Sequence, residues 1–71
     1  MMNNSLIRLP AVKERTGLSR STIYNRISQG TFPRPVGLGG RAVGWLQSEV
    51  EAWIEQRVSE SRAAANGVRH E

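Results

Sequence analysis

The side chains best suited to chemistry on this chain lie between Ser19 and Gln29, and they are hydrogen-bonding rather than catalytic types. Hydroxyl, amide, phenol and guanidinium groups gather on one side of this segment, around Asn25. Groups of these kinds bind phosphate oxygens and the edges of bases in nucleic acids. The Asn25 amide can donate and accept at once, which suits it to adenine. The sequence therefore predicts a polar surface that binds double-stranded DNA.

The other side chains of this surface suit simpler contacts. Arg20 suits a guanine or a phosphate, whereas Ser21 and Tyr24 suit phosphates, as do the remaining arginines. Thr22 lies at the edge of the expected surface, where packing is an alternative role. For every one of these residues, plain exposure to solvent is the alternative interpretation. The predicted DNA contacts are Ser19, Arg20, Ser21, Thr22, Tyr24, Asn25, Arg26 and Ser28, with Arg34 and Arg41 further along the chain.

A short helix over residues 19–29 is expected to position these side chains. Ser19 is a good N-cap, because its hydroxyl can accept a hydrogen bond from a backbone N–H of the first turn. Gly30 suits the helix end, where the backbone often passes through positive φ. Ile23 and Ile27 are four residues apart and so share the inward side. Two isoleucines are enough to dock such a helix and leave its polar side free.

A second helix, over residues 10–16, precedes the turn at Gly17, with Val12 as its inward residue. Counted from Leu9 as the first position of a helix-turn-helix unit, Gly17 is the ninth residue, where the tight turn often needs positive φ. The spacing therefore predicts a helix-turn-helix. The alternative is an ordinary helical hairpin without a ligand. Residues 6–9 are expected to form a short strand or an extended segment at the edge of the core.

Residues 31–45 are rich in glycine and proline, and they predict two short strands around a glycine turn. A two-stranded ribbon is barely stable alone, so it is expected to lean on the helices through Val36, Val43 and Trp45. Phe32 is expected in the core. The glycines also suggest a phosphate cradle, but no Gly-Lys-Ser/Thr follows them, which argues against a nucleotide-binding loop.

Arg41 is expected at or beside the tip of this hairpin. An arginine on a projecting hairpin next to a helix-turn-helix is typical of a DNA-binding wing, and from there it would contact the minor groove or the DNA backbone. The alternative for Arg41 is a solvated turn residue.

The C-terminal third predicts a longer helix with a core-facing stripe. Ser48 and Glu51 fit a capping box, and the helix is expected to run to about Val58. Ala63 and its neighbours favour an extension that Asn66-Gly67 would stop. The expected stripe consists of Val50, Trp53, Ile54 and Val58. The predicted organisation is a flexible N-terminus over 1–5, a winged helix-turn-helix domain over 6–58, and a flexible or frayed tail over 59–71.

Charge is unevenly distributed along the 71 residues. The net charge is +4, yet residues 1–45 carry seven basic residues and one acid, whereas residues 46–71 carry three basic residues and five acids. Basic charge is therefore concentrated around the polar helix, as it is in nucleic-acid-binding domains. A chance bias on a solvated surface is the alternative.

Composition argues against several other classes of protein. The chain contains no cysteine, no aspartate and a single histidine, His70, so neither a catalytic triad nor a metal site can be assembled from it. We expect no enzyme activity, no cofactor and no small-molecule ligand. No apolar run approaches the roughly 20 residues of a membrane span, and residues 1–10 lack a signal-peptide core. These features favour a bacterial cytoplasmic protein associated with the nucleoid.

Four segments together resemble a known family. They are residues 7–12 (IRLPAV), 17–24 (GLSRSTIY), 32–36 (FPRPV) and 44–54 (GWLQSEVEAWI). These residues are similar to the AlpA family of small phage and prophage regulators, over roughly residues 6–57. The resemblance implies a non-catalytic winged helix-turn-helix that binds DNA, mainly helical with a small β-hairpin: three helices plus a two-stranded wing. The tail after Val58 lies outside the resemblance.

The family resemblance implies one of two roles on DNA. The first is a sequence-specific transcriptional regulator acting on the integrase promoter of a prophage or genomic island. The second is an excisionase that binds and bends attachment-site DNA. A protein-interaction adaptor without DNA binding is the alternative of another class, and it would need an exposed apolar patch. Because one small module covers few base pairs, weak or cooperative self-association on DNA is also expected.

Overall fold

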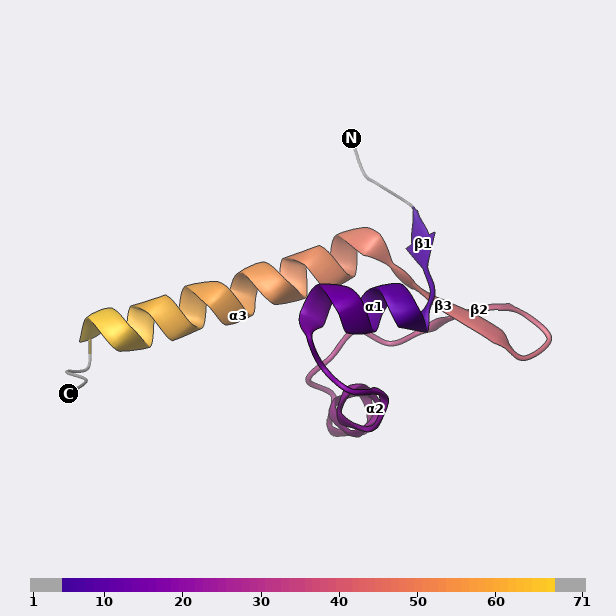
Figure 1. The fold of residues 1–71 in the computed structure, drawn as a ribbon, viewed down its shortest axis with the longest axis horizontal. Coiled ribbons are helices and arrows are strands. Elements are labelled where there is room, and N and C mark those ends of the chain that lie inside the picture. Colours follow the sequence, from indigo (N-terminus) through magenta and orange to yellow (C-terminus); the bar gives the residue numbers. More distant parts are fainter. Residues whose placement is uncertain (1–4, 68–71) are drawn as a thin grey trace.

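A computed structural model describes residues 5–67 of the chain, with side chains described through residue 64. Three helices and a small antiparallel sheet make up the fold, so the predicted mainly helical fold with a β-hairpin is confirmed (Figure 1). The flexible N-terminus predicted over 1–5 lies, except for Ser5, outside the described residues. The elements in chain order are β1 (Leu6–Ile7), α1 (Leu9–Thr16), α2 (Arg20–Gln29), β2 (Val36–Gly39), β3 (Ala42–Leu46) and α3 (Gln47–Gly67).

Helices α1 and α2 form the predicted pair around a glycine turn. Gly17 ends α1 with φ of 74°, and its N–H donates to the Lys13 carbonyl over 2.8 Å. The Ser19 hydroxyl accepts the Thr22 N–H at 3.2 Å, and Gly30 ends α2 with φ of 78°. Both caps of α2 are therefore as predicted. They matter because a helix of 10 residues is too short to be stable by itself in water.

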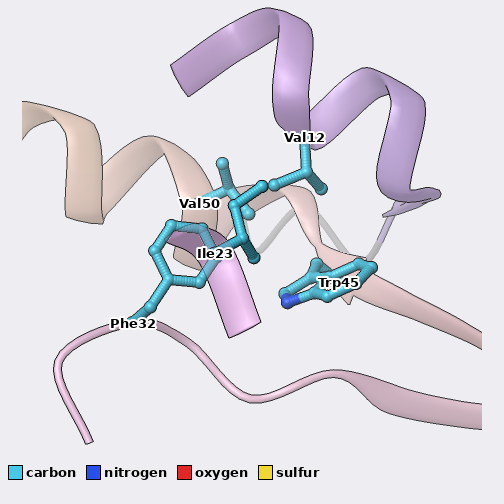
Figure 2. Close-up of a cluster of buried hydrophobic side chains, with 5 residues drawn as sticks. All are labelled: Val12, Ile23, Phe32, Trp45 and Val50. Carbon is cyan, nitrogen blue, oxygen red and sulfur yellow. The ribbon is translucent and has the colours of Figure 1, made fainter. Parts of the chain in front are cut away.

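Five buried side chains from five different segments make the core, as Figure 2 shows. Trp45 is its largest member, and its ring N–H donates to the Pro33 carbonyl over 3.1 Å. This bond satisfies the one polar atom of the ring and ties the connector after α2 to β3. The predicted burial of the core residues is confirmed for Val12 in α1, Ile23 in α2, Phe32 in the connector, Trp45 in β3 and Val50 in α3.

Strand β3 is the centre of a three-stranded sheet rather than half of a two-stranded one. Its other neighbour is β1, with Ile7 opposite Trp45, so the short strand predicted near residues 6–9 is confirmed. All four residues of β2 are exposed, because β2 is an edge strand that extends past the helices. Val43 and Trp45 pack on the core as expected, whereas Val36 is outside the core cluster and lines a groove beside α3.

Helix α3 differs from prediction at both ends. It begins at Gln47, directly after β3, so Ser48 lies inside the first turn and the predicted capping box is wrong. The Gln47 N–H instead donates to the Ser5 carbonyl over 2.8 Å, a contact brought about by β1. At its far end α3 continues past Val58 and stops at the predicted Asn66-Gly67. The predicted flexibility of residues 59–71 stays a prediction, and residues 68–71 lie outside the described part.

Candidate nucleic-acid interface

The polar side of α2 faces outward. Ile23 is fully buried and Ile27 half-buried, whereas Arg20, Ser21, Tyr24, Asn25 and Ser28 are all exposed. This division follows from the helical period, which places residues three and four apart on one face. Within residues 5–67, the Asn25 side-chain amide makes no hydrogen bond. Its donor and acceptor are therefore both available to a ligand.

Three of the predicted contacts already have hydrogen-bond partners at the start of α2, where the Ser19 and Ser21 hydroxyls lie 3.3 Å apart. The Ser19 hydroxyl, besides accepting the Thr22 N–H, donates to the Thr22 hydroxyl over 3.0 Å. Thr22 is half-buried, in keeping with the packing role that was its alternative. Both residues stay predicted contacts, but their evident role in the free protein is to cap the helix.

Ser28, unlike Ser19 and Thr22, takes no part in the cap at the start of α2. Its hydroxyl donates to the Asn25 carbonyl over 2.7 Å, a local bond of the kind that serine makes in helices. The oxygen keeps its capacity to accept a further hydrogen bond. Ser28 can therefore accept a donor from a ligand without losing its own contact.

Tyr24 connects the outer face of α2 to the core. Its ring meets the buried Trp45 ring edge-on, with centroids 6.2 Å apart and an interplanar angle of 70°. The central carbon of the Arg20 guanidinium lies 5.4 Å from the centroid of the Tyr24 ring. Cation–π attraction and edge-to-face packing thus orient Arg20 and Tyr24 together. Sequence reasoning missed the contact between Tyr24 and Trp45, because no local pattern relates residues on different elements.

The three other predicted arginines lie in different surroundings. Arg26 is half-buried, and its Nε is a buried polar atom without a hydrogen-bond partner, which is uncommon in folded proteins. Arg41 is exposed in the turn between β2 and β3, at the tip of the hairpin as predicted. Figure 1 shows that this hairpin projects away from the helices.

Arg34 lies in the connector between α2 and β2, also exposed. It lines a groove of about 810 Å³ between that connector and α3, together with Trp53 and Arg57. The Trp53 ring N–H donates to the Thr31 carbonyl over 2.7 Å, which holds the connector against α3. Arg34, predicted together with Arg41 as a contact of the wing, thus lies in the segment that leads into the hairpin.

Acidic side chains are gathered on α3. Glu49, Glu51 and Glu55 are exposed, and Glu51 is paired with Arg15 of α1 at 3.6 Å. Both side chains of this pair are strongly solvated, so it contributes little to stability. The basic surface is thus carried by the helix pair and the hairpin, as the charge distribution predicted.

Within residues 5–67, no three histidine, cysteine or carboxylate side chains lie close enough to share a metal ion. Over the same range, no helix combines the length and apolar character needed to cross a membrane.

Comparison with known proteins gives the context for this surface. The chain is 53% identical over 53 residues to the uncharacterized protein ORF88 of Enterobacteria phage P4, covering 75% of this chain but 60% of that protein's length. It is 39% identical over 66 residues to the DNA-binding transcriptional activator AlpA of Escherichia coli K12, covering 79% of this chain and 94% of the relative. The sequence model of the prophage CP4-57 regulatory protein (AlpA) family matches residues 5–58. The match takes in all the elements from β1 to β3 and the first half of α3, and the chain therefore belongs to the AlpA family.

Proposed function

We propose that this chain is a sequence-specific, non-catalytic DNA-binding regulator of transcription, and that α2 enters the major groove. The observation that carries the proposal is the exposed Asn25 amide, which has no hydrogen-bond partner within residues 5–67 and lies on a helix docked by Ile23. The E. coli relative, whose name describes a DNA-binding transcriptional activator, supports the same function. An α-helix fits the major groove of B-DNA, where each base pair presents a distinct pattern of donors and acceptors.

The roles of the side chains on α2 follow from their environments. Asn25 would form paired hydrogen bonds with an adenine, and Arg20, oriented by Tyr24, would contact a guanine or a phosphate. Ser21, Tyr24 and Ser28 would hold phosphates, which fixes the register of the helix on the duplex. Arg26 would add a phosphate contact through the terminal nitrogens of its guanidinium, because its Nε is buried.

The hairpin would serve as a wing, which would make the fold a winged helix-turn-helix. Arg41 at its tip would reach the minor groove or the backbone, and Arg34, before β2, would add a phosphate contact. Contacts of this kind strengthen binding to any sequence and make it sensitive to salt. The wing would therefore supply affinity, whereas α2 would supply specificity.

The target that fits this proposal best is the integrase promoter of a prophage or genomic island, in a bacterial cytoplasm where the protein is associated with the nucleoid. One module of this size covers few base pairs, so we expect repeated sites and weak self-association between copies on DNA. Binding at an attachment site with bending of the DNA would indicate an excisionase instead.

The decisive experiment has two steps. Selection of bound sequences from random double-stranded DNA gives the preferred site, and footprinting across the integrase promoter and the attachment site then locates it. We expect the promoter to be protected in the footprint, and a gel-shift assay at low ionic strength to show a retarded band. Asn25→Ala is the informative variant, and Glu49→Ala on α3 is its matched control. Absence of any retarded band at low ionic strength, with correctly folded protein, would contradict the proposal.

A further inference from the structure

The C-terminal half of α3 extends beyond every other element of the fold (Figure 1). From Glu55 through Ala64 every side chain is exposed, and none of these residues belongs to the hydrophobic core or to the half-buried apolar residues packed against it. Unpacked helices of fewer than about 12–15 residues are marginal in water. A partner that covered one face of the C-terminal half of α3 would stabilise this part of the helix.

One face of this half is a shallow groove of about 530 Å³. Val58 lies along it, and 40% of its surface is exposed. Ile54, at the end nearer the core, is only half-buried. The residues that line the groove are Ile54, Glu55, Val58, Ser59, Arg62 and Ala63.

Two side chains of opposite charge border this groove, and among the described residues neither has an ion-pair or hydrogen-bond partner. Glu55 and Arg62 are seven residues apart, which is about 10 Å along a helix. By contrast Arg57 and Glu60, on another face of α3, pair with each other. The groove therefore carries one free acid and one free base at its two ends.

We propose that this groove receives the same groove of a second copy of the chain, with the two α3 helices antiparallel. In that arrangement Glu55 of each copy meets Arg62 of the other, because the two positions exchange under the two-fold axis. Ile54 would lie opposite Ala63, and Val58 opposite Ser59. A parallel pair would place Glu55 near Glu55 and Arg62 near Arg62, and like charges at that spacing repel. The charge pattern thus favours a second copy of the chain as the partner, with its α3 antiparallel to the first.

The expected association is weak. Six side chains of each copy line the groove, whereas stable interfaces use about 20–30 residues a side. We expect dimers in free solution only at high micromolar concentration or above. Two copies bound to neighbouring DNA sites would pair more readily, because the DNA raises their effective concentration. Pairing through α3 would account for the weak self-association proposed for copies on DNA, but the pairing itself does not require DNA binding.

Sedimentation equilibrium of the full chain without DNA tests the pairing. We expect the average mass to rise with concentration, and Glu55→Arg or Arg62→Glu alone to weaken association by about tenfold. The double variant Glu55→Arg/Arg62→Glu restores the opposite charges, so its association should return to within about threefold of the original. Glu49→Arg, on the same helix but outside the groove, is the matched control and should change little.

Cysteine cross-linking tests the direction of the helices, since the chain has no cysteine of its own. When Glu55→Cys and Arg62→Cys variants are mixed and oxidised, the antiparallel arrangement gives mainly the mixed disulfide. Homodimers of each variant as the main products would contradict the proposed direction. A constant monomer mass up to about 1 mM, or a double variant as weak as the single ones, would overturn the pairing. Loss of DNA binding with pairing intact would count against the proposed function alone.

Discussion

Helix α2 and the β2–β3 hairpin both present polar groups to solvent, but the fold holds them very differently. Helix α2 is capped at both ends, docked through the buried Ile23 and held to the core by the Tyr24–Trp45 ring contact. Strand β2 is exposed along its whole length, and the register between β2 and β3 shifts near Gly39. One region is packed on the core, whereas the other is an edge strand whose residues are all exposed.

This difference fits a division of labour on DNA. Base recognition needs donors and acceptors in fixed positions, which a docked helix provides. Phosphate contacts tolerate variation in geometry, because Coulomb attraction is long-ranged and largely independent of direction. If this division holds, changes in α2 and in the hairpin will differ in their effects on stability, on sequence preference and on salt dependence.

The largest effect is expected in the core under α2. Ile23→Ala should lower the free energy of unfolding by about 2–5 kcal/mol, because the site is fully buried and a cavity remains. Leu38→Ala in the exposed β2 should change it by less than about 0.5 kcal/mol. Urea denaturation of both variants gives the comparison, with Ile23→Val as an intermediate case. Equal losses at the two positions would mean that the hairpin is as firmly packed as the helix.

The second effect concerns sequence preference. Asn25→Ala should cost about 1–3 kcal/mol at one base pair of the preferred site and little elsewhere. Competition binding against sites changed at single positions measures it, with Glu49→Ala as the control. An unchanged preference at every position would reject Asn25 as a base contact.

The third effect separates capping from DNA contact at Ser19. Ser19→Ala should lower the free energy of unfolding by about 1 kcal/mol, because the Thr22 N–H loses its acceptor. Ser19→Asp keeps an acceptor and should retain most of the stability. Denaturation curves of the two variants, followed by binding assays, show whether any loss of affinity exceeds the loss of folded protein. A stability equal to the original in Ser19→Ala would refute the capping role.

The smallest effect is expected at the tip of the hairpin. Arg41→Ala should weaken binding by about the same factor on all sequences. The slope of the logarithm of the binding constant against the logarithm of the salt concentration should fall in magnitude by about 1, because one phosphate contact is lost. Fluorescence anisotropy at several salt concentrations measures the slope. A slope identical to that of the original chain would remove Arg41 from the interface, and a changed base preference would assign it a more specific role.

Local signals in the sequence accounted for most of the helix pair. Gly17 and Gly30 were predicted at positive φ, and Ser19 as a cap, because each depends on residues within one turn. The isoleucine spacing likewise placed Ile23 in the core. The candidate DNA contacts were named from the same local pattern, and most of them lie on the exposed side of α2.

Contacts between distant segments account for what the sequence did not reveal. The start of α3 is determined by the Gln47 N–H bound to the Ser5 carbonyl, so the local capping signal at Ser48 was misleading. Val36 is of a residue type that usually packs in strands, yet it lies on an edge strand whose residues are all exposed. The groove that Arg34 lines also depends on tertiary packing, through the Trp53 contact with the connector.

The ring contact between Tyr24 and Trp45 also equips the molecule with an optical reporter. An indole shielded from water emits at shorter wavelength than a partly solvated one, and Trp45 is fully buried while Trp53 is not. Any ligand that displaces the Tyr24 ring changes the surroundings of Trp45 directly. Occupancy of the outer face of α2 can therefore be followed by intrinsic fluorescence in a Trp53→Phe background, with no dye attached.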